Sequence, residues 1–172
     1  MIGHYDNFPK NFHRIESFST KYANRTLQER LIKVIYETNR NKFSFEEIAY
    51  PTVPQCTIIF EAGLADSKNF NFIDDEETKK VSIALRKTPF RRMDFFWAVR
   101  YYKYAQGNKA PLKFDYYLMR ISFDKKNMEI KVFHERGPRY FSPEDLITFL
   151  VNEVNKTSTR KILKRTEIEP EI

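Results

Sequence analysis

Basic and aromatic residues are interspersed through residues 86–113, and this composition suits the binding of nucleic acid. Positive side chains attract phosphates, whereas flat rings can stack on any base. The residues that we expect at such a surface are Arg86, Lys87, Arg91, Arg92, Trp97, Arg100, Tyr101 and Lys103. The alternative is that the basic side chains are only solvated and the rings are buried, as aromatic rows at helical spacing usually are. Both interpretations stay open.

A second candidate site is the loop 134–140, with the sequence His-Glu-Arg-Gly-Pro-Arg-Tyr. It lies between a predicted strand and a predicted helix, and the first turn of a helix attracts anions. Arg136 and Arg139 would hold a phosphate there, and Gly137 would allow close approach of the backbone. Tyr140 would stack on a base. The alternative is a tight turn in which the glutamate of the loop pairs with an arginine.

We expect no enzymatic activity, no metal ion and no cofactor. His134 beside Glu135 could transfer protons, but the sequence shows no nucleophile or substrate clamp placed to work with it. The chain has 4 glycines and contains neither a glycine-rich phosphate loop nor a His-Glu-x-x-His motif. Cys56 has apolar neighbours and is typical of a buried structural thiol. The acidic run 74–77 is typical of a turn in solvent.

The elements that must position these residues are clearest near the C-terminus. Residues 114–123 alternate between two faces, residues 124–127 form a short polar connection, and the alternation resumes from Met128. This pattern predicts an antiparallel hairpin. Ser142 and Pro143 then supply an N-cap hydroxyl and a proline at the first helical position, which predicts a helix over residues 143–156.

Helices are also predicted before this unit. A capping box at Thr26 begins a helix that ends near Asn39, and a second helix from Ser44 ends before Pro51. A further helix is predicted over residues 93–104, where three- and four-residue spacing puts these residues on one face: Met93, Phe96, Trp97, Arg100, Tyr101 and Tyr104. A hairpin is predicted from residues 69–72 over the acidic turn to residues 81–85.

Residues 52–65 are ambiguous. The segment Thr57-Ile58-Ile59-Phe60 is rich in β-branched residues and favours a strand, whereas Pro54 and Gly63 could begin and end a third helix. In the second case, helices followed by a hairpin, with the phrase Phe60-Glu61-Ala62-Gly63-Leu64, resemble the winged helix-turn-helix family over residues 26–87. The resemblance implies that Gln55 and Thr57 face the major groove of duplex DNA, and that the protein is a dimer.

Composition bounds the remaining choices. The 172 residues are 41% hydrophobic, enough for one domain or two very small ones. The net charge of +7 and a pI of about 9.4 favour a polyanionic partner. The single cysteine excludes an intrachain disulfide and indicates a cytoplasmic protein. Neither a signal peptide nor a membrane-spanning apolar run is expected.

The predicted fold is α+β, with N-terminal helices, an antiparallel sheet of about four to five strands, and the 114–134 hairpin closed by the 143–156 helix. We expect an irregular arm over residues 1–21, a single domain over 22–156 and a mobile charged tail over 157–172. A division near residue 88 would instead separate a winged-helix-like part, 26–87, from a helix-hairpin-helix part, 90–156.

The predicted function is non-enzymatic binding of nucleic acid, with single-stranded DNA or RNA preferred because unstacked bases expose their faces to aromatic rings. One alternative is a winged-helix regulator that binds duplex DNA. Another is a protein-interaction subunit of a larger complex, in which the aromatic surface meets a protein partner or a second copy of the chain.

Overall fold

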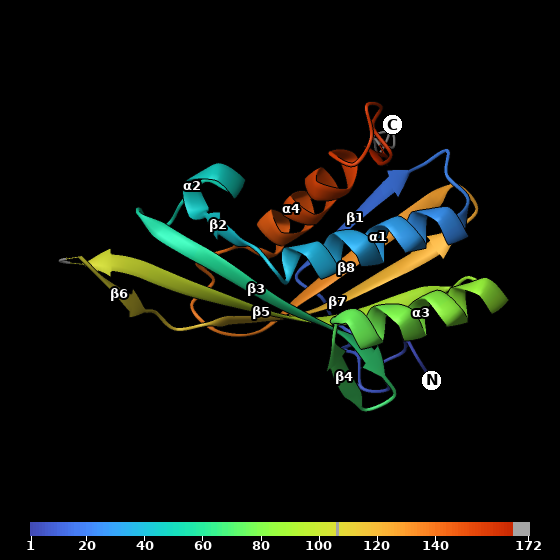
Figure 1. The fold of residues 1–172 in the computed structure, drawn as a ribbon, viewed down its shortest axis with the longest axis horizontal. Coiled ribbons are helices and arrows are strands. Elements are labelled where there is room, and N and C mark those ends of the chain that lie inside the picture. Colours follow the sequence, from blue (N-terminus) through green and yellow to red (C-terminus); the bar gives the residue numbers. More distant parts are fainter. Residues whose placement is uncertain (106, 167–172) are drawn as a thin grey trace.

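The computed structural model describes residues 1–105 and 107–166, and Figure 1 shows their arrangement. Within these residues, nine strands form a single sheet that four helices accompany. The strands are β1 (Arg14–Ser19), β2 (Lys42–Ser44), β3 (Cys56–Asp66), β4 (Asn69–Phe72), β5 (Arg92–Ala105), β6 (Asn108–Pro111), β7 (Asp115–Asp124), β8 (Asn127–Arg136) and β9 (Lys164–Arg165). The helices are α1 (Asn24–Thr38), α2 (Phe45–Ile48), α3 (Asp75–Lys87) and α4 (Pro143–Asn155).

The sheet is antiparallel, with the strand order β2-β3-β5-β7-β8-β1-β9. β4 pairs with the end of β3, and β6 pairs with the end of β5. The long strands β3, β5, β7 and β8 make up its centre. The β5–β6 hairpin projects beyond the helices at one end of the molecule (Figure 1).

The helices α1, α3 and α4 lie on the same face of the sheet (Figure 1), which we call the inner face. The core fills the space between them and the strands. The ring of Phe60 stacks on that of Phe149 of α4 at 4.6 Å between centroids, and it meets Trp97 edge-on at 5.8 Å. Because side chains alternate along a strand, Trp97 points into this core while its neighbours on β5 point to the opposite, outer face.

The N-terminal residues cross the outer face. The backbone N–H of Gly3 donates to Ala65, and its carbonyl accepts from the N–H of Asp94. The buried carboxylate of Asp94 accepts two hydrogen bonds from Arg120, of 2.7 and 2.9 Å. The ring of Phe8 covers that guanidinium at 4.3 Å. These contacts pin the first residues of the chain to β3, β5 and β7.

The predicted sheet of four to five strands is wrong, since nine strands form the sheet, and the helices are not grouped at the N-terminus. The segment 93–104, expected as a helix, is strand β5. Met93, Trp97 and Tyr101 are spaced by four residues, and this spacing keeps side chains on one face of a helix and also on one face of a strand. The segment forms a strand because β3 and β7 pair with it along most of its length.

The segment 81–85 shows the opposite error. We expected a strand, but these residues belong to helix α3. Val81 and Leu85 are buried four residues apart, whereas Ile83 between them is 55% exposed. The acidic run 74–77 forms the start of this helix rather than a hairpin tip, and the Asp74 side chain accepts from the N–H of Glu77 as an N-cap.

Residues 56–66 are a strand, so the recognition helix that the winged-helix resemblance implies does not form there, and that predicted fold is wrong. β3 also pairs with β5, which joins the segment 26–87 to the rest of the sheet. The hairpin predicted over 114–134 is present as β7 and β8, and the helix predicted over 143–156 is present as α4 with its capping box at Ser142.

Both ends of the chain contribute to the sheet. The predicted irregular arm contains β1, which pairs with β8. The described part of the predicted mobile tail, residues 157–166, contains β9 and two side chains, Ile162 and Leu163, that are each 2% exposed. The rest of that prediction, residues 167–172, lies outside the described residues. No helix in the described ranges has the length and apolar character needed to cross a membrane.

The burial of Cys56 predicts that its thiol reacts slowly. Its side chain is 3% exposed, and burial raises the pKa of the thiol above its ordinary value. Because the thiolate is the reactive form, we expect the folded protein at pH 8 to react with a disulfide reagent at least about tenfold more slowly than a free thiol. The measurement is the absorbance time course with and without denaturant, and equal rates in both would contradict the structure.

Candidate functional site

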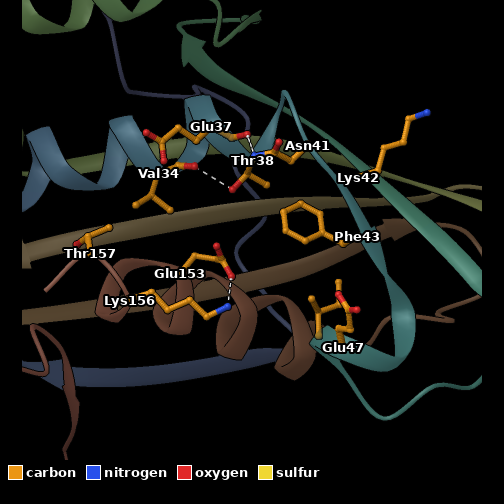
Figure 2. Close-up of a pocket in the computed structure, with 11 residues that line it drawn as sticks. Val34, Glu37, Thr38, Asn41, Lys42, Phe43, Glu47, Glu153, Lys156 and Thr157 are labelled. Carbon is orange, nitrogen blue, oxygen red and sulfur yellow. Dashed lines mark hydrogen bonds and ion pairs between the residues drawn. The ribbon is translucent and has the colours of Figure 1, made fainter. Parts of the chain in front are cut away.

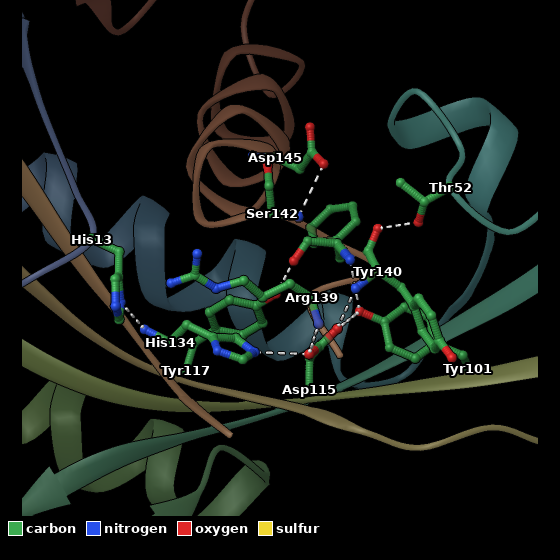
Figure 3. Close-up of polar contacts among 11 residues, drawn as sticks. His13, Thr52, Tyr101, Asp115, Tyr117, His134, Arg139, Tyr140, Ser142 and Asp145 are labelled. Atoms are coloured by element: carbon green, nitrogen blue, oxygen red, sulfur yellow. Dashed lines mark hydrogen bonds and ion pairs between the residues drawn. The ribbon is translucent and has the colours of Figure 1, made fainter. Parts of the chain in front are cut away.

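The buried carboxylate of Asp115, the first residue of β7, organises the candidate site (Figure 3). It is fully buried and accepts four hydrogen bonds. The donors are the Tyr101 hydroxyl, Nε2 of His134 at 2.8 Å, and the backbone N–H groups of Arg139 at 2.7 Å and Tyr140 at 3.0 Å. These bonds occupy the acceptor capacity of the carboxylate. Asp115 therefore holds β5, β8 and the loop after β8 together, rather than acting as a base.

Two buried tyrosines complete this network. The oxygen of Tyr101 accepts from the N–H of Phe141 at 3.0 Å, and the hydroxyl of Tyr117 donates to the Phe141 carbonyl. Burial is the main reason that the pKa of Tyr101 and of Tyr117 lies above its ordinary value. Both side chains therefore stay neutral hydroxyls that donate. They fix the backbone immediately before Ser142, where α4 begins.

Gly137 brings the loop against the start of β7. Its φ of +115° is unfavourable for residues with a side chain, and a Cβ there would lie 2.2 Å from the Phe114 carbonyl oxygen and 2.5 Å from Asp115 Oδ1. Arg139 also has a positive φ, of 60°. This conformation places the loop beside an open pocket of about 700 Å³, lined by Lys113, Phe114, Tyr116, Arg136, Gly137 and Pro138.

A row of aromatic rings continues from this pocket across the outer face. Tyr116 lies 6.1 Å from Phe114 and 5.6 Å from Phe96, and Phe96 lies 5.6 Å from Phe70. All four rings are partly exposed. We call these residues, Phe70, Phe96, Phe114 and Tyr116, the aromatic row. Arg100 lies over Phe114 at 5.1 Å, so a cation stands directly against the row.

His13 lies at the other side of the loop and contributes little charge. Its Nδ1 accepts from the backbone N–H of His134 at 2.9 Å, and its ring stacks on Phe133 at 4.9 Å. Burial, followed by the positive charge of Arg139 and by His134, lowers the pKa of His13. The imidazole is therefore mostly neutral at pH 7, and any attraction for anions in this area comes from the arginines and lysines.

The structure separates the predicted site residues into three groups. Trp97 and Tyr101 are fully buried on the inner face, so their rings are not accessible to bases. Arg100 and Arg136 come together around Phe114, and Lys103 is exposed further along β5. Arg139 and Tyr140 lie in the loop 137–141, which the hydrogen bonds to Asp115 and Tyr101 hold in place and which we call the anchored loop. The remaining predicted residues, Arg86, Lys87, Arg91 and Arg92, are exposed near the opposite end of β5, roughly 25 Å away by the rise of a strand.

Sequence reasoning did not single out Phe96, Lys113, Phe114 and Tyr116 as site residues. A signal for two of them was present, because the alternation in 114–123 puts Phe114 and Tyr116 on one face and Tyr117 on the other. Phe96 was hidden by the helical interpretation of β5, in which it shares a face with the buried Trp97. The same alternation puts Asp115 on the face of Tyr117, but nothing in the local sequence shows which groups satisfy its carboxylate.

A different pocket, of about 550 Å³, lies between α1, β2 and α4 (Figure 2). Its lining carries both signs of charge, with Glu37, Glu47 and Glu153 against Lys42 and Lys156. Lys156 donates to Glu153 at 2.8 Å. Since the lining carries three carboxylates and two ammonium groups, the pocket offers no attraction for an anionic ligand.

The described residues contain no group of three or more histidine, cysteine or acidic side chains that could hold a metal ion. Comparison with protein-family models, with curated proteins and with solved structures found no match for this chain.

Replacing Gly137 with alanine tests the anchored loop. We expect Gly137→Ala to lower the free energy of unfolding by about 3 kcal/mol, because the new Cβ overlaps the Phe114 carbonyl and the backbone is strained. Gly107→Ala is the matched control. Gly107 also has a positive φ, of +79°, but no atom within 4 Å of a new Cβ, so only about 1 kcal/mol of strain is expected. Urea denaturation measures both, and equal losses would contradict the close approach.

Asp115→Asn tests the buried network. An amide donates where the carboxylate accepts, so at least one buried N–H loses its partner, and we expect a loss of about 3 kcal/mol in the free energy of unfolding. Asp124→Asn is the control at the exposed end of the same strand, with an expected change within about 0.5 kcal/mol. Thermal and urea unfolding would measure both. A single ordinary hydrogen bond contributes about 1 kcal/mol to stability. If Asp115→Asn lowers the free energy of unfolding by less than that, the carboxylate is dispensable.

Proposed function

We propose that this protein binds single-stranded nucleic acid on the outer face of its sheet, along the aromatic row. One observation carries the proposal: Phe114 and Tyr116 line an open pocket together with Lys113 and Arg136, while Arg100 lies against Phe114. Flat rings that can stack on bases thus stand beside cations that can pair with phosphates. This combination is typical of proteins that bind single strands on a sheet surface.

The geometry favours a single strand over a duplex. The aromatic row lies on a sheet face, and the bases of a duplex are stacked on one another and cannot reach those rings. In a single strand the bases can turn outward, and each base can stack on one ring. The row continues from Phe114 through Tyr116 to Phe96, which gives successive bases successive partners. Tyr5 of the N-terminal segment packs on the last ring of the row, Phe70, at 4.7 Å.

The charges around the aromatic row explain how a single strand of nucleic acid would be attracted to it. Arg136 and Lys113 line the pocket, and Lys109 lies over the rings of Tyr102 and Tyr104 on the projecting hairpin. Arg100 also forms an ion pair with Glu61, at 2.9 Å. The net charge of +7 adds a general attraction for polyanions.

The proposal is binding without chemistry. The groups that resemble catalytic ones, Asp115 and His134, are hydrogen-bonded to each other, and the carboxylate also holds the backbone of the loop. This arrangement accounts for them as an anchor. The proposal retains nucleic acid as the partner and the cytoplasm as the location, as the basic composition and the single cysteine suggest.

The test is fluorescence anisotropy with labelled single-stranded RNA, single-stranded DNA and duplexes of the same length, over a series of salt concentrations. We expect single strands to bind more tightly, and Tyr116→Ala or Phe114→Ala to weaken binding about 5-fold to 100-fold, the range for losing one stacked base. Tyr36→Ala on helix α1 is the aromatic control and should leave the affinity unchanged. Equal binding by all these variants would refute the site.

Charge variants test the phosphate contacts separately. Arg136→Gln should weaken binding to all sequences and reduce the slope of log affinity against log salt by about 0.7, the value for one lost phosphate contact on a single strand. Arg91→Gln removes an equal charge near the far end of β5 and should change that slope much less. If Arg91→Gln has the larger effect on the slope, the bound nucleic acid lies at the other end of the sheet.

A further inference from the structure

A third pocket, unrelated to the aromatic row, is lined by five cations. It has a volume of about 980 Å³ and lies where the chain after β1, the β7–β8 turn and the segment after α4 meet. The cations are Lys21, Lys126, Arg160, Lys161 and Lys164, and the ring of Tyr22 also lines it. The rest of the lining consists of Ser19, Thr20, Asn127, Ser158, Thr159 and Ile162. We call it the basic pocket.

One wall of the basic pocket is held by Asn155, the last residue of α4. Its Oδ1 accepts from the N–H groups of Ile162 at 3.0 Å and Leu163 at 2.9 Å, and its Nδ2 donates to the Leu163 carbonyl at 3.1 Å. Ile162 and Leu163 are each 2% exposed. The segment that carries Arg160, Lys161 and Lys164 is thus held in place by the burial of Ile162 and Leu163 and by their hydrogen bonds to Asn155.

The opposite wall is fixed by the β7–β8 turn. The N–H of Thr20 donates to the Lys126 carbonyl at 2.9 Å, and Nζ of Lys126 donates to the Lys21 carbonyl at 2.7 Å. Both walls are therefore tied to strands of the sheet, and the five cations line one formed cavity.

The charges of the basic pocket are uncompensated within the described residues. No acidic side chain lines it, and none of its five cations forms an ion pair with another described residue. Its immediate neighbours differ: Lys156 pairs with Glu153 at 2.8 Å, and Arg165 pairs with Glu16 at 2.9 Å. Like charges held together repel, so an anion bound among them would remove a repulsion as well as add attraction.

We propose that the basic pocket binds a small ligand that carries two or three linked phosphate groups. A single phosphate carries about two negative charges at neutral pH, fewer than the five cations present. Linked phosphates match the number of cations more closely. The volume lies within the range of about 300–1,000 Å³ for small-molecule sites, which favours a compact ligand over a polymer.

The basic pocket is separate from the aromatic row. Lys126 directly precedes β8, whereas Arg136 is its last residue, so the two sites lie about 30 Å apart along that strand. The inference therefore does not depend on the binding of nucleic acid, and each site can fail alone.

Lys126 allows a test that separates folding from binding. Its φ is 62°, a conformation that glycine adopts without strain. Lys126→Gly therefore removes one pocket cation while relieving the backbone, so we expect a folded protein with a melting temperature close to that of the wild type. Lys125→Ala is the matched control, because it removes the same charge from the same turn but does not line the pocket.

The experiment is isothermal titration of the full chain with sodium tripolyphosphate and with ATP, without divalent cations, at about 150 mM salt. We expect binding of one molecule per chain, weakened about tenfold or more by Lys126→Gly and by Lys161→Ala, and changed less than about twofold by Lys125→Ala. Tyr116→Ala should bind tripolyphosphate like the wild type even where it loses nucleic acid. Tighter binding of ATP than of tripolyphosphate would show that the pocket also contacts the nucleoside. Equal binding of the two would show that the pocket recognises the phosphates alone.

Two results would overturn the proposal. One is the absence of binding heat, and of any rise in melting temperature, at millimolar tripolyphosphate. The other is an equal loss of affinity in Lys125→Ala and Lys126→Gly, which would mean that the ligand responds to the general charge of the molecule and not to the pocket.

Discussion

The structure depends on one buried carboxylate. Asp115 is out of contact with water, and a charge in that position is tolerated only when hydrogen bonds replace hydration. Its four donors come from β5, from β8 and from the loop that follows, so elements distant in sequence must meet for the charge to be satisfied. The register of the central strands, the path of the loop and the start of α4 are therefore constrained together.

Adjacent residues on the central strands have opposite roles, and this links stability to the surface. Trp97 and Tyr117 fill the core, while their neighbours Phe96 and Tyr116 form part of the aromatic row. Because the strand cannot rotate without exposing the core side chains, the outer rings are held at fixed spacing. The protein therefore loses less conformational freedom when a ligand stacks on these rings than it would if the rings were carried by a flexible loop.

Local signals in the sequence were sufficient for the parts of the fold that depend on local interactions. The cap at Ser142 and the polar connection at 124–127 predicted α4 and the β7–β8 hairpin. They were insufficient where apolar residues recur every four positions, because Val81 with Leu85 and Met93 with Trp97 fit either a helix or a strand. Pairing with β3 and β7 decided the second case, and such pairing is not visible in the segment itself. The network around Asp115 joins residues up to 40 positions apart, so no local pattern could reveal it.

The distribution of charge shows why composition alone could not locate a site. The net charge of +7 is a sum over surfaces of different kinds. Lys156 and Arg165 are neutralised by glutamates, the pocket of Figure 2 mixes both signs, and the basic pocket holds five cations within a few residues of those pairs. The contrast arises because Asn155 turns the chain after α4 back toward Lys21 and Lys126. A segment predicted as a mobile charged tail thus becomes, over residues 157–166, one wall of a formed cavity.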